Sequence, residues 1–144
     1  MRIAIASDHA AVDLRLAVAE HLSAAGHSIE DLGPEPGRRV DYPDYAAAVA
    51  GAVVAGGCDR GVLLCGSGIG MSIAANKFAG IRAALVHDVT TARLCAEHND
   101  ANVLCLGART SGPLIALECI DAWLGATFDV RHQHRLDLIT RLEG

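Results

Sequence analysis

Short apolar runs alternate along the chain with longer segments in which apolar residues recur every three or four positions. The short runs predict strands, and the three-to-four spacing predicts amphipathic helices. The predicted strands are residues 2–7, 28–33, 60–65, 81–87 and 102–108. The predicted helices are 8–26, 45–57, a segment that follows the glycines at 66–70, 90–100, 113–125 and 131–142.

Five strand-then-helix units in series indicate an α/β fold. The units predict a mainly parallel sheet with helices on both faces, and an extra helix follows at the C-terminus. A length of 144 residues fits a single domain, 1–144. Ligands of such folds bind beyond the carboxyl ends of the strands. Four predicted strands end in candidate motifs for that edge, which are SDH at 7–9, CGSGIG at 65–70, HD at 87–88 and GAR at 107–109.

Composition narrows the class of protein. Hydrophobic residues make up 51% of the chain and aromatic residues 3%, as expected for a core of buried parallel strands. A net charge of −5 without a lysine or arginine block argues against nucleic acid as a partner. No apolar run has the length of a membrane span or the form of a signal peptide. The five cysteines form no CxxC pair and lie mostly in apolar runs, which predicts buried thiols and a cytoplasmic protein.

The segment LLCGSGIGMSIAANK, residues 63–77, places a thiol beside a glycine loop that joins a strand to a helix. Such a loop turns backbone N–H groups toward an anion. A dinucleotide site stays open as an alternative, with Asp88 taking a ribose hydroxyl, although the spacing is G-x-G-x-G rather than G-x-G-x-x-G. A phosphatase loop is excluded, because Met71 and Ser72 stand where its arginine is needed.

Cys65 has two interpretations. Most buried cysteines act as small hydrophobic residues, and this is the interpretation for Cys58, Cys95, Cys105 and Cys119. Cys65 differs from them because a glycine loop that enters a helix favours a reactive thiolate.

Other polar residues also allow a structural and a functional interpretation. Asp8 and His9 fit the first turn of a helix with Asp8 as its cap, yet they follow a strand at the expected ligand edge. His98 suits either a favourable interaction with a helix C-terminus or a catalytic role. Arg131 and Arg135 share one helix face, as a phosphate-binding pair or as a solvated basic patch.

The remaining histidines and acids predict no metal site. His132 and His134 are two positions apart, which splays them on a helix, and His87–Asp88 lacks partners nearby in the sequence. Asp88 also fits as the N-terminal cap of the helix at 90–100.

From end to end, the chain resembles the type B ribose-5-phosphate isomerases and the related galactose-6-phosphate and allose-6-phosphate isomerases. The motifs that carry the resemblance are SDHAA, DYPDYA, CGSGIGMSIAANKFAGIRAA, HNDANVLCLGAR, DAWLG and RHQHR. The resemblance implies a Rossmann-like three-layer α/β/α sandwich with a five-stranded sheet, and an enzyme that uses no metal and no nucleotide cofactor. It also implies a homodimer or tetramer whose active site is shared between subunits.

The resemblance also implies roles for individual residues. Cys65 would be the base that moves a proton between C2 and C1 through an enediolate, and Ser67 would assist its deprotonation. His98 and Asp8 would open the furanose ring as acid and base. Backbone N–H groups of the loop would bind the enediolate oxygens, and Asn99 would hold hydroxyls. The residues implied in binding substrate are Asp8, His9, Gly66, Ser67, Gly68, Ile69, Gly70, Asn99, Arg109, Arg131 and Arg135.

The substrate implied by the resemblance is ribose 5-phosphate, interconverted with ribulose 5-phosphate. Allose 6-phosphate, galactose 6-phosphate and a tetrose phosphate remain alternatives, because His134, His87–Asp88 and the loop at 34–41 depart from relatives. A non-catalytic nucleotide-binding module is the alternative from a different class.

Overall fold

The computed structural model describes residues 1–144 and contains one five-stranded sheet. The strands are β1 (Arg2–Ser7), β2 (Ser28–Asp31), β3 (Arg60–Cys65), β4 (Ala83–Leu85) and β5 (Val103–Gly107). The helices are α1 (Val12–Ala24), α2 (Tyr42–Val54), α3 (Ile69–Ala75), α4 (Val89–Asn99), α5 (Pro113–Gly125), the 3₁₀ turn η1 (Val130–His132) and α6 (Gln133–Arg141). None of these helices is both long enough and apolar enough to cross a membrane.

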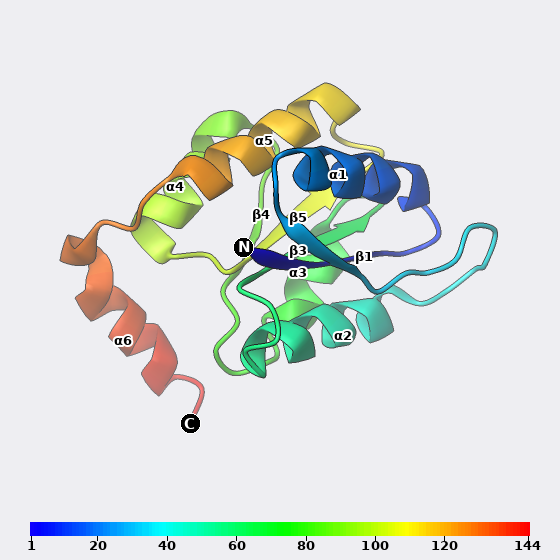
Figure 1. The fold of residues 1–144 in the computed structure, drawn as a ribbon. Helices are drawn as coiled ribbons and strands as arrows, with labels where there is room; N and C mark the ends of the chain where they lie inside the picture. The colour runs from blue at the N-terminus through cyan, green and yellow to red at the C-terminus, as the bar shows by residue number, and fades with distance from the viewer.

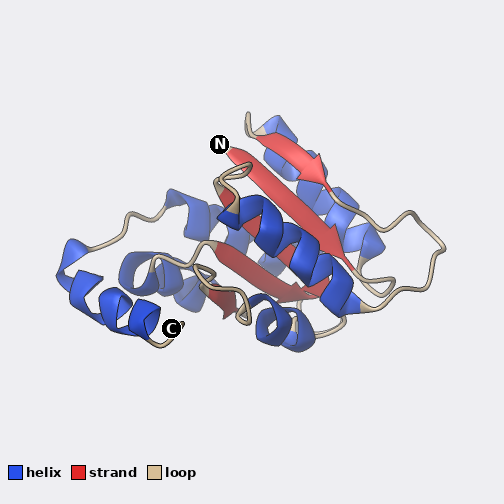
Figure 2. Cartoon of the chain, turned by 90° about the horizontal axis from the view of Figure 1, so that it is seen from below, coloured by secondary structure: helices blue, strands red, loops and turns tan.

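All the strand pairs are parallel, in the order β2-β1-β3-β5-β4, and the strand arrows point the same way in Figure 2. Helices α1, α4 and α5 cover one face of the sheet, while α2 and α3 cover the other (Figure 1). The α/β class and the three-layer sandwich expected from the sequence are therefore confirmed. Since every strand is parallel, all five carboxyl ends meet at one edge of the sheet.

Alternation along the central strands builds two separate cores. In β1, Ile3 and Ile5 pack under α1, α4 and α5, whereas Ala4 and Ala6 face α2 and α3. Successive side chains of a strand point to opposite faces, so the same alternation runs through β3 and β5. In β3 it directs the side chain of Cys65 into the α2–α3 layer.

Two predicted helix starts are wrong. Helix α1 begins at Val12 rather than residue 8, because the Asp8 carboxylate accepts a hydrogen bond from Ala10 N (2.9 Å) and holds 8–11 in a turn. Asp8 is therefore not the cap of α1. Helix α2 begins at Tyr42 rather than residue 45, with Pro43 in its first turn, where the missing N–H costs no helical hydrogen bond.

The segment after α5, residues 126–144, forms a C-terminal arm that projects beyond the sandwich (Figure 1) and is tied back to it where Gly80 N donates to Glu143 Oε1 (2.9 Å). Asp129 accepts a hydrogen bond from Arg131 N (3.1 Å), which starts η1 and interrupts the single helix expected at 131–142. Leu136 is the one buried side chain of α6, and Leu138, Ile139 and Leu142 are exposed. The arm thus keeps apolar side chains partly exposed, with Ile139 and Leu142 lining a pocket together with Phe78 and Ile81.

Candidate active site

Three neighbouring strand ends bring the first group of candidate residues together. In the sheet register Ser7 pairs with Leu64, and Cys65 pairs with Gly107. Asp8 N donates to Leu64 O (3.0 Å), and Ala108 N donates to Cys65 O (2.8 Å), which extends this pairing beyond the strands. We call Asp8, His9, Cys65, loop 66–70 and Arg109 the rim group.

Cys65 differs from the other cysteines in its hydrogen bond. Gly68 N donates to Cys65 Sγ at 3.1 Å, and the side chain is 5% exposed. Sγ therefore accepts a hydrogen bond from the backbone at the point where the glycine loop begins.

The other four thiols are buried without such a donor. The pKa of Cys58 is raised to about 11, mainly by burial and to a smaller extent by its hydrogen bond to Glu30. Burial raises the pKa of Cys95 to about 11 as well, and it also raises the pKa values of Cys105 and Cys119. These thiols stay protonated at neutral pH, as the sequence interpretation of them as hydrophobic residues requires.

The glycine loop is held tightly against the end of β5. Gly68 caps α3 with a φ of +78°, and an added Cβ would lie 2.9 Å from the Leu106 carbonyl carbon. An added Cβ on Gly107 would lie 2.7 Å from Ser67 Cα. Both positions require glycine, the first for its backbone angle and for space, the second for space alone. The close approach fixes the loop relative to Cys65.

The N-terminus of α3 opens from this loop. Ser67 Oγ accepts a hydrogen bond from Ile69 N (3.3 Å), so the structure places this hydroxyl on the first turn of the helix rather than on Cys65 Sγ. The N–H groups of Gly70 and Met71 also lie in the first turn, where no helical carbonyl can accept from them. They are suitably placed to donate to an anion.

Arg109 lies against the start of the glycine loop, and His9 lies against the loop at 34–41. The His9 ring Nδ1 lies 3.1 Å from Val40 O, which joins the exposed histidine to the loop at 34–41. Arg109 N donates to Gly66 O (2.9 Å), and Arg109 Nη1 lies 3.4 Å from the Cβ that Gly66 lacks. The rim therefore carries positive charge above the glycine loop.

The second group of candidate residues lies at the end of α4 and on the C-terminal arm. The rings of His98 and His132 stand 4.5 Å apart between centroids. Arg131 Nε donates to His132 Nε2 (3.2 Å), and Arg135 Nη1 lies 3.3 Å from His132 Nδ1. Arg131 is in η1 rather than in a helix with Arg135, so His132, not a shared helix face, links the two arginines. We call His98, Asn99, Arg131, His132 and Arg135 the arm group.

The charge of the arm group is concentrated on its arginines. Loss of hydration, together with the positive charges of His98, Arg131 and Arg135, lowers the pKa of His132. A neutral His132 can accept from one guanidinium without adding to the repulsion between them. Arg131 also pairs with Asp129 Oδ2 at 2.9 Å.

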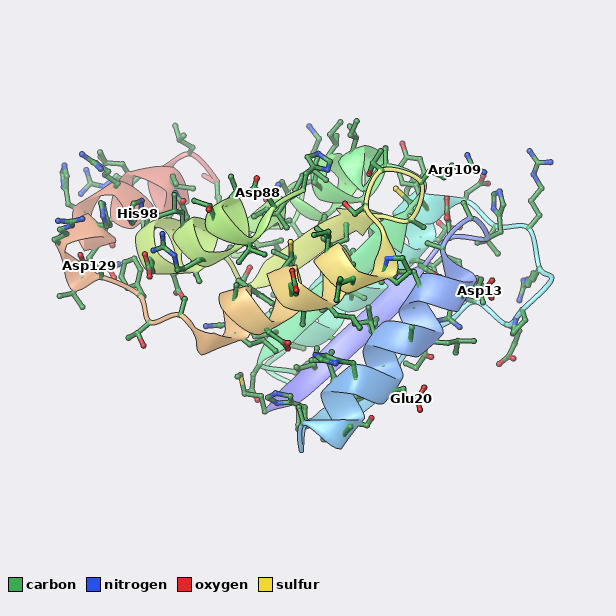
Figure 3. The ribbon with its side chains drawn as sticks, turned by 90° about the horizontal axis from the view of Figure 1, so that it is seen from above. Asp13, Glu20, Asp88, His98, Arg109 and Asp129 are labelled. Atoms are coloured by element: carbon green, nitrogen blue, oxygen red, sulfur yellow. The ribbon has the colours of Figure 1, made fainter.

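The fold of the chain does not bring the two groups together. Helix α4 runs back from the carboxyl ends of the strands, so His98 lies beside the start of β5, and Cys65 pairs with the end of β5. Four residue steps of strand separate these levels by about 13 Å. Figure 3 shows His98 near one end of the molecule and Arg109 well away from it, past the middle of the sheet.

The residues of the dinucleotide alternative have other partners. Asp88 accepts from Thr91 N and Thr91 Oγ1, both at 2.8 Å, and therefore caps α4, which confirms its predicted capping role. These hydrogen bonds lower the pKa of the Asp88 carboxyl, and the hydrogen bond from the backbone contributes most.

No three His, Cys, Asp or Glu side chains lie close enough together to hold a metal ion.

Two residues of the rim escaped the sequence interpretation. An added Cβ on Gly70 would lie 2.6 Å from the Tyr42 ring, so this ring forms a wall of the loop. Gly107 supplies the space for Ser67 described above. Tyr42 lies in the DYPDYA motif and Gly107 in the GAR motif, but the motifs alone predict no role for either residue.

Comparison with known proteins assigns this arrangement to a family. The ribose/galactose isomerase family model matches residues 3–139. Ribose-5-phosphate isomerase B of Escherichia coli (strain K12) is 46% identical over 99% of this chain and 96% of its own length. The structure of Clostridium thermocellum ribose-5-phosphate isomerase B superposes with a TM-score of 0.97, at 46% identity over 99% of this chain and 97% of that one. The Mycoplasma genitalium enzyme with bound ribulose-5-phosphate gives a TM-score of 0.94, at 42% identity over 99% and 95%.

Proposed function

Because the chain belongs to the ribose/galactose isomerase family, we propose that it interconverts ribose 5-phosphate and ribulose 5-phosphate. The enzyme is a sugar-phosphate isomerase. The observation that carries the proposal is the Cys65 thiol, held by Gly68 N at the mouth of a glycine loop. A thiolate there is a base beside donors for the negative oxygens that form when it removes a proton.

The isomerisation moves one proton from C2 to C1 and a second from the C2 hydroxyl to the C1 oxygen, and it leaves the carbon count unchanged. Cys65 removes the proton from C2 of the open-chain aldose, and the electron pair forms the enediolate. The N–H groups of loop 66–70 donate to the enediolate oxygens, a kind of stabilisation worth about 2.7–4 kcal/mol per donor. Cys65 then returns a proton to C1, and the hydroxyl proton on the C2 oxygen passes to the C1 oxygen, which yields the ketose. Ser67 supports the deprotonated state of the thiol through the loop that it helps to fold.

Ring opening precedes that proton transfer, because ribose 5-phosphate is mainly a closed furanose. Asp8 takes the proton of the hydroxyl on C1, and C1 forms a carbonyl as its bond to the ring oxygen breaks. His98 donates a proton to the ring oxygen, and Asn99 holds the hydroxyls that result. Atoms and charges balance, since one proton leaves the substrate at Asp8 and one enters at His98.

The phosphate carries the charge that selects this substrate. His9, Arg109, Arg131 and Arg135 bind it, and guanidinium groups suit the purpose because they donate two hydrogen bonds in a plane. The exposed Arg131 and Arg135 side chains contact His132, and the His132 ring lies against His98. The proposed acid and the proposed phosphate-binding residues therefore belong to one surface.

We further propose that the site is completed by a second copy of the chain, in a homodimer or a tetramer of such dimers. The distance between the rim group and the arm group supports this, because a sheet length separates Cys65 from His98 within one protomer. The exposed apolar residues Leu138, Ile139 and Leu142 of the arm support it as well. The rim of one protomer then receives the arm of its partner.

Five buried thiols without a disulfide support a cytoplasmic location, and the proposed reaction is a step of the pentose phosphate pathway. The proposed reaction uses no metal and no cofactor, and the proposal includes no nucleic acid or membrane partner.

The deciding experiment compares kcat/KM, without added metal, for ribose 5-phosphate, allose 6-phosphate, galactose 6-phosphate and erythrose 4-phosphate. A preference for ribose 5-phosphate supports the proposal. The family description names galactose as well as ribose, so preference for a six-carbon sugar is the second candidate. A preference for a six-carbon sugar would indicate that the loop at 34–41, which His9 contacts, and His134 set the length of the sugar. Calorimetry that showed tight NAD or ATP binding without turnover of any sugar phosphate would instead support a nucleotide-binding module.

A further inference from the structure

The end of α4 adopts a strained backbone directly after the residues proposed to open the sugar ring. Asp100 is the one residue other than glycine with a positive φ, at 43°, and it caps α4 immediately after His98 and Asn99. Glycine or asparagine ordinarily takes this position, and an acid is also unfavourable at the negative end of a helix dipole. Strain of this kind persists only where surrounding contacts enforce it.

Arg82 provides those contacts. Its Nε donates to Asn99 O and Asp100 O, both at 3.0 Å, and its Nη2 donates to Asp100 O and Asp100 Oδ2, both at 2.8 Å. The Arg82 guanidinium therefore donates to the last carbonyls of α4 and neutralises the Asp100 carboxylate. Arg60 adds a longer contact to Asp100 Oδ1 at 3.4 Å.

The base of the Arg82 side chain is itself fixed. Arg82 N donates to Asn102 Oδ1 (2.8 Å), and Asn102 N donates back to Arg82 O (3.2 Å). The Arg82 side chain is 25% exposed, so it is partly shielded from water. The helix end is thus tied to the segment that leads into β4, not merely to its own chain neighbours.

The helix end in turn supports the arm group. Asp129 N donates to Glu97 O at 2.8 Å, one residue before His98, and the His98 ring contacts His132. A shift of this helix end would displace the acid, the substrate-binding Asn99 and the root of the arm together.

We propose that Arg82 is a positioning residue for ring opening, which acts by clamping the end of α4 so that His98 and Asn99 face the sugar. This inference rests on the proposed function, because it assigns Arg82 to one step of that reaction. A residue with a merely structural role would affect all steps alike.

The test uses Arg82→Gln, with Arg93→Gln as the matched control. Arg93 is on α4, the helix that ends with His98 and Asn99, and it pairs with Glu97 without a hydrogen bond to residues 99–100. Two rates are measured by proton NMR in D₂O, namely net conversion of ribose 5-phosphate and incorporation of deuterium at C1 of ribulose 5-phosphate. The ketose has no ring to open, because the oxygen that would close it carries the phosphate, so its exchange reports on the Cys65 step alone.

We expect Arg82→Gln to lower kcat for ribose 5-phosphate by about 100-fold, within the usual contribution of a general acid, and to lower deuterium exchange by less than about 10-fold. Arg93→Gln should leave both rates within about twofold of wild type. Asp100→Asn, which tolerates the positive φ and leaves both backbone acceptors of Arg82 in place, should show a smaller loss with the same imbalance.

Equal losses of the two rates in Arg82→Gln, or losses no greater than in Arg93→Gln, would overturn the inference. Wild-type protein that failed to convert ribose 5-phosphate would instead overturn the proposed function, so the two failures are distinguishable. A thermal unfolding curve for each variant shows whether an equal loss comes from unfolding, which also counts against a positioning role.

Discussion

The rim group and the arm group differ in how firmly one protomer holds them. Cys65 is 5% exposed at the end of a central strand, and its loop is packed against β5. The Arg131 side chain is 70% exposed on a short turn outside the sandwich. Proton transfer depends on a base fixed to within fractions of an ångström, so it suits the sheet edge. Exposed guanidinium groups attract a charged substrate from solution, and they become shielded only when a partner covers them.

The largest expected effect comes from removing the base of the rim. Cys65→Ala should lower kcat by about 10³-fold, in the range that general bases contribute, with little change in KM. Cys105→Ala is the matched control, because Cys105 is a buried thiol in the same core and its loss removes a similar volume. Steady-state kinetics of both variants with ribose 5-phosphate makes the comparison. Near-full activity in Cys65→Ala would contradict the assigned base.

Mixing inactive subunits tests whether the rim and arm groups act across two chains. Cys65→Ala protein unfolded and refolded together with His98→Asn protein should recover about a quarter of wild-type activity, since half of the dimers are mixed and each has one intact site. Each variant refolded alone is the control. Recovery no greater than the sum of the two controls would mean that each site uses the rim and the arm of the same chain.

A smaller effect is expected at the phosphate grip. Arg131→Ala should raise KM for ribose 5-phosphate by about 10- to 100-fold, because a hydrogen bond to a charged group contributes about 1.5–3 kcal/mol. The value of kcat should change little. Arg141→Ala, an exposed arginine at the end of α6, is the control. A fall in kcat alone would show that Arg131 belongs to the chemistry rather than to binding.

The smallest effect on activity is expected at Asp88, which lies at the rim edge but caps α4. Its pKa is lowered mainly by the hydrogen bond from Thr91 N, so its ionised form stabilises the fold above the ordinary pKa of 3.8, and this contribution is lost as pH falls through the lowered value. Asp88→Ala should therefore lower the Tm at pH 7 by a few degrees without changing kcat, and the difference should shrink below about pH 4. Thermal melts across this pH range, with Asp44→Ala in the first turn of α2 as control, check the prediction.

The sequence predicted the sheet and the rim well for a common physical reason. Buried parallel strands need continuous apolar runs, and neighbouring strands of this kind end at one edge, so the adjacency of Asp8, Cys65 and Arg109 follows from topology. The start of α1 was missed because an aspartate fits a helix cap and a tight turn equally well. Arg131 was placed in a helix because spacing alone cannot show that the Asp129 side chain starts a 3₁₀ turn.

The proposed pairing of the rim of one copy with the arm of another cannot be predicted from the periodicity of one chain. The position of His98 at the far end of the strands follows from the direction of α4. The clamp at Arg82 was also invisible in the sequence, because its acceptors are backbone carbonyls that any residue supplies.

The placement of the arm after α5 has a consequence for the gene. Both cores, every strand and the base Cys65 are encoded before Gly125, whereas Arg131 and Arg135 are encoded after it. A premature stop codon just beyond Gly125 should therefore yield a folded polypeptide that keeps the proposed base Cys65 and lacks the proposed phosphate-binding residues Arg131 and Arg135. Such an allele would be read as a loss of enzyme in a metabolic screen, although its protein product persists.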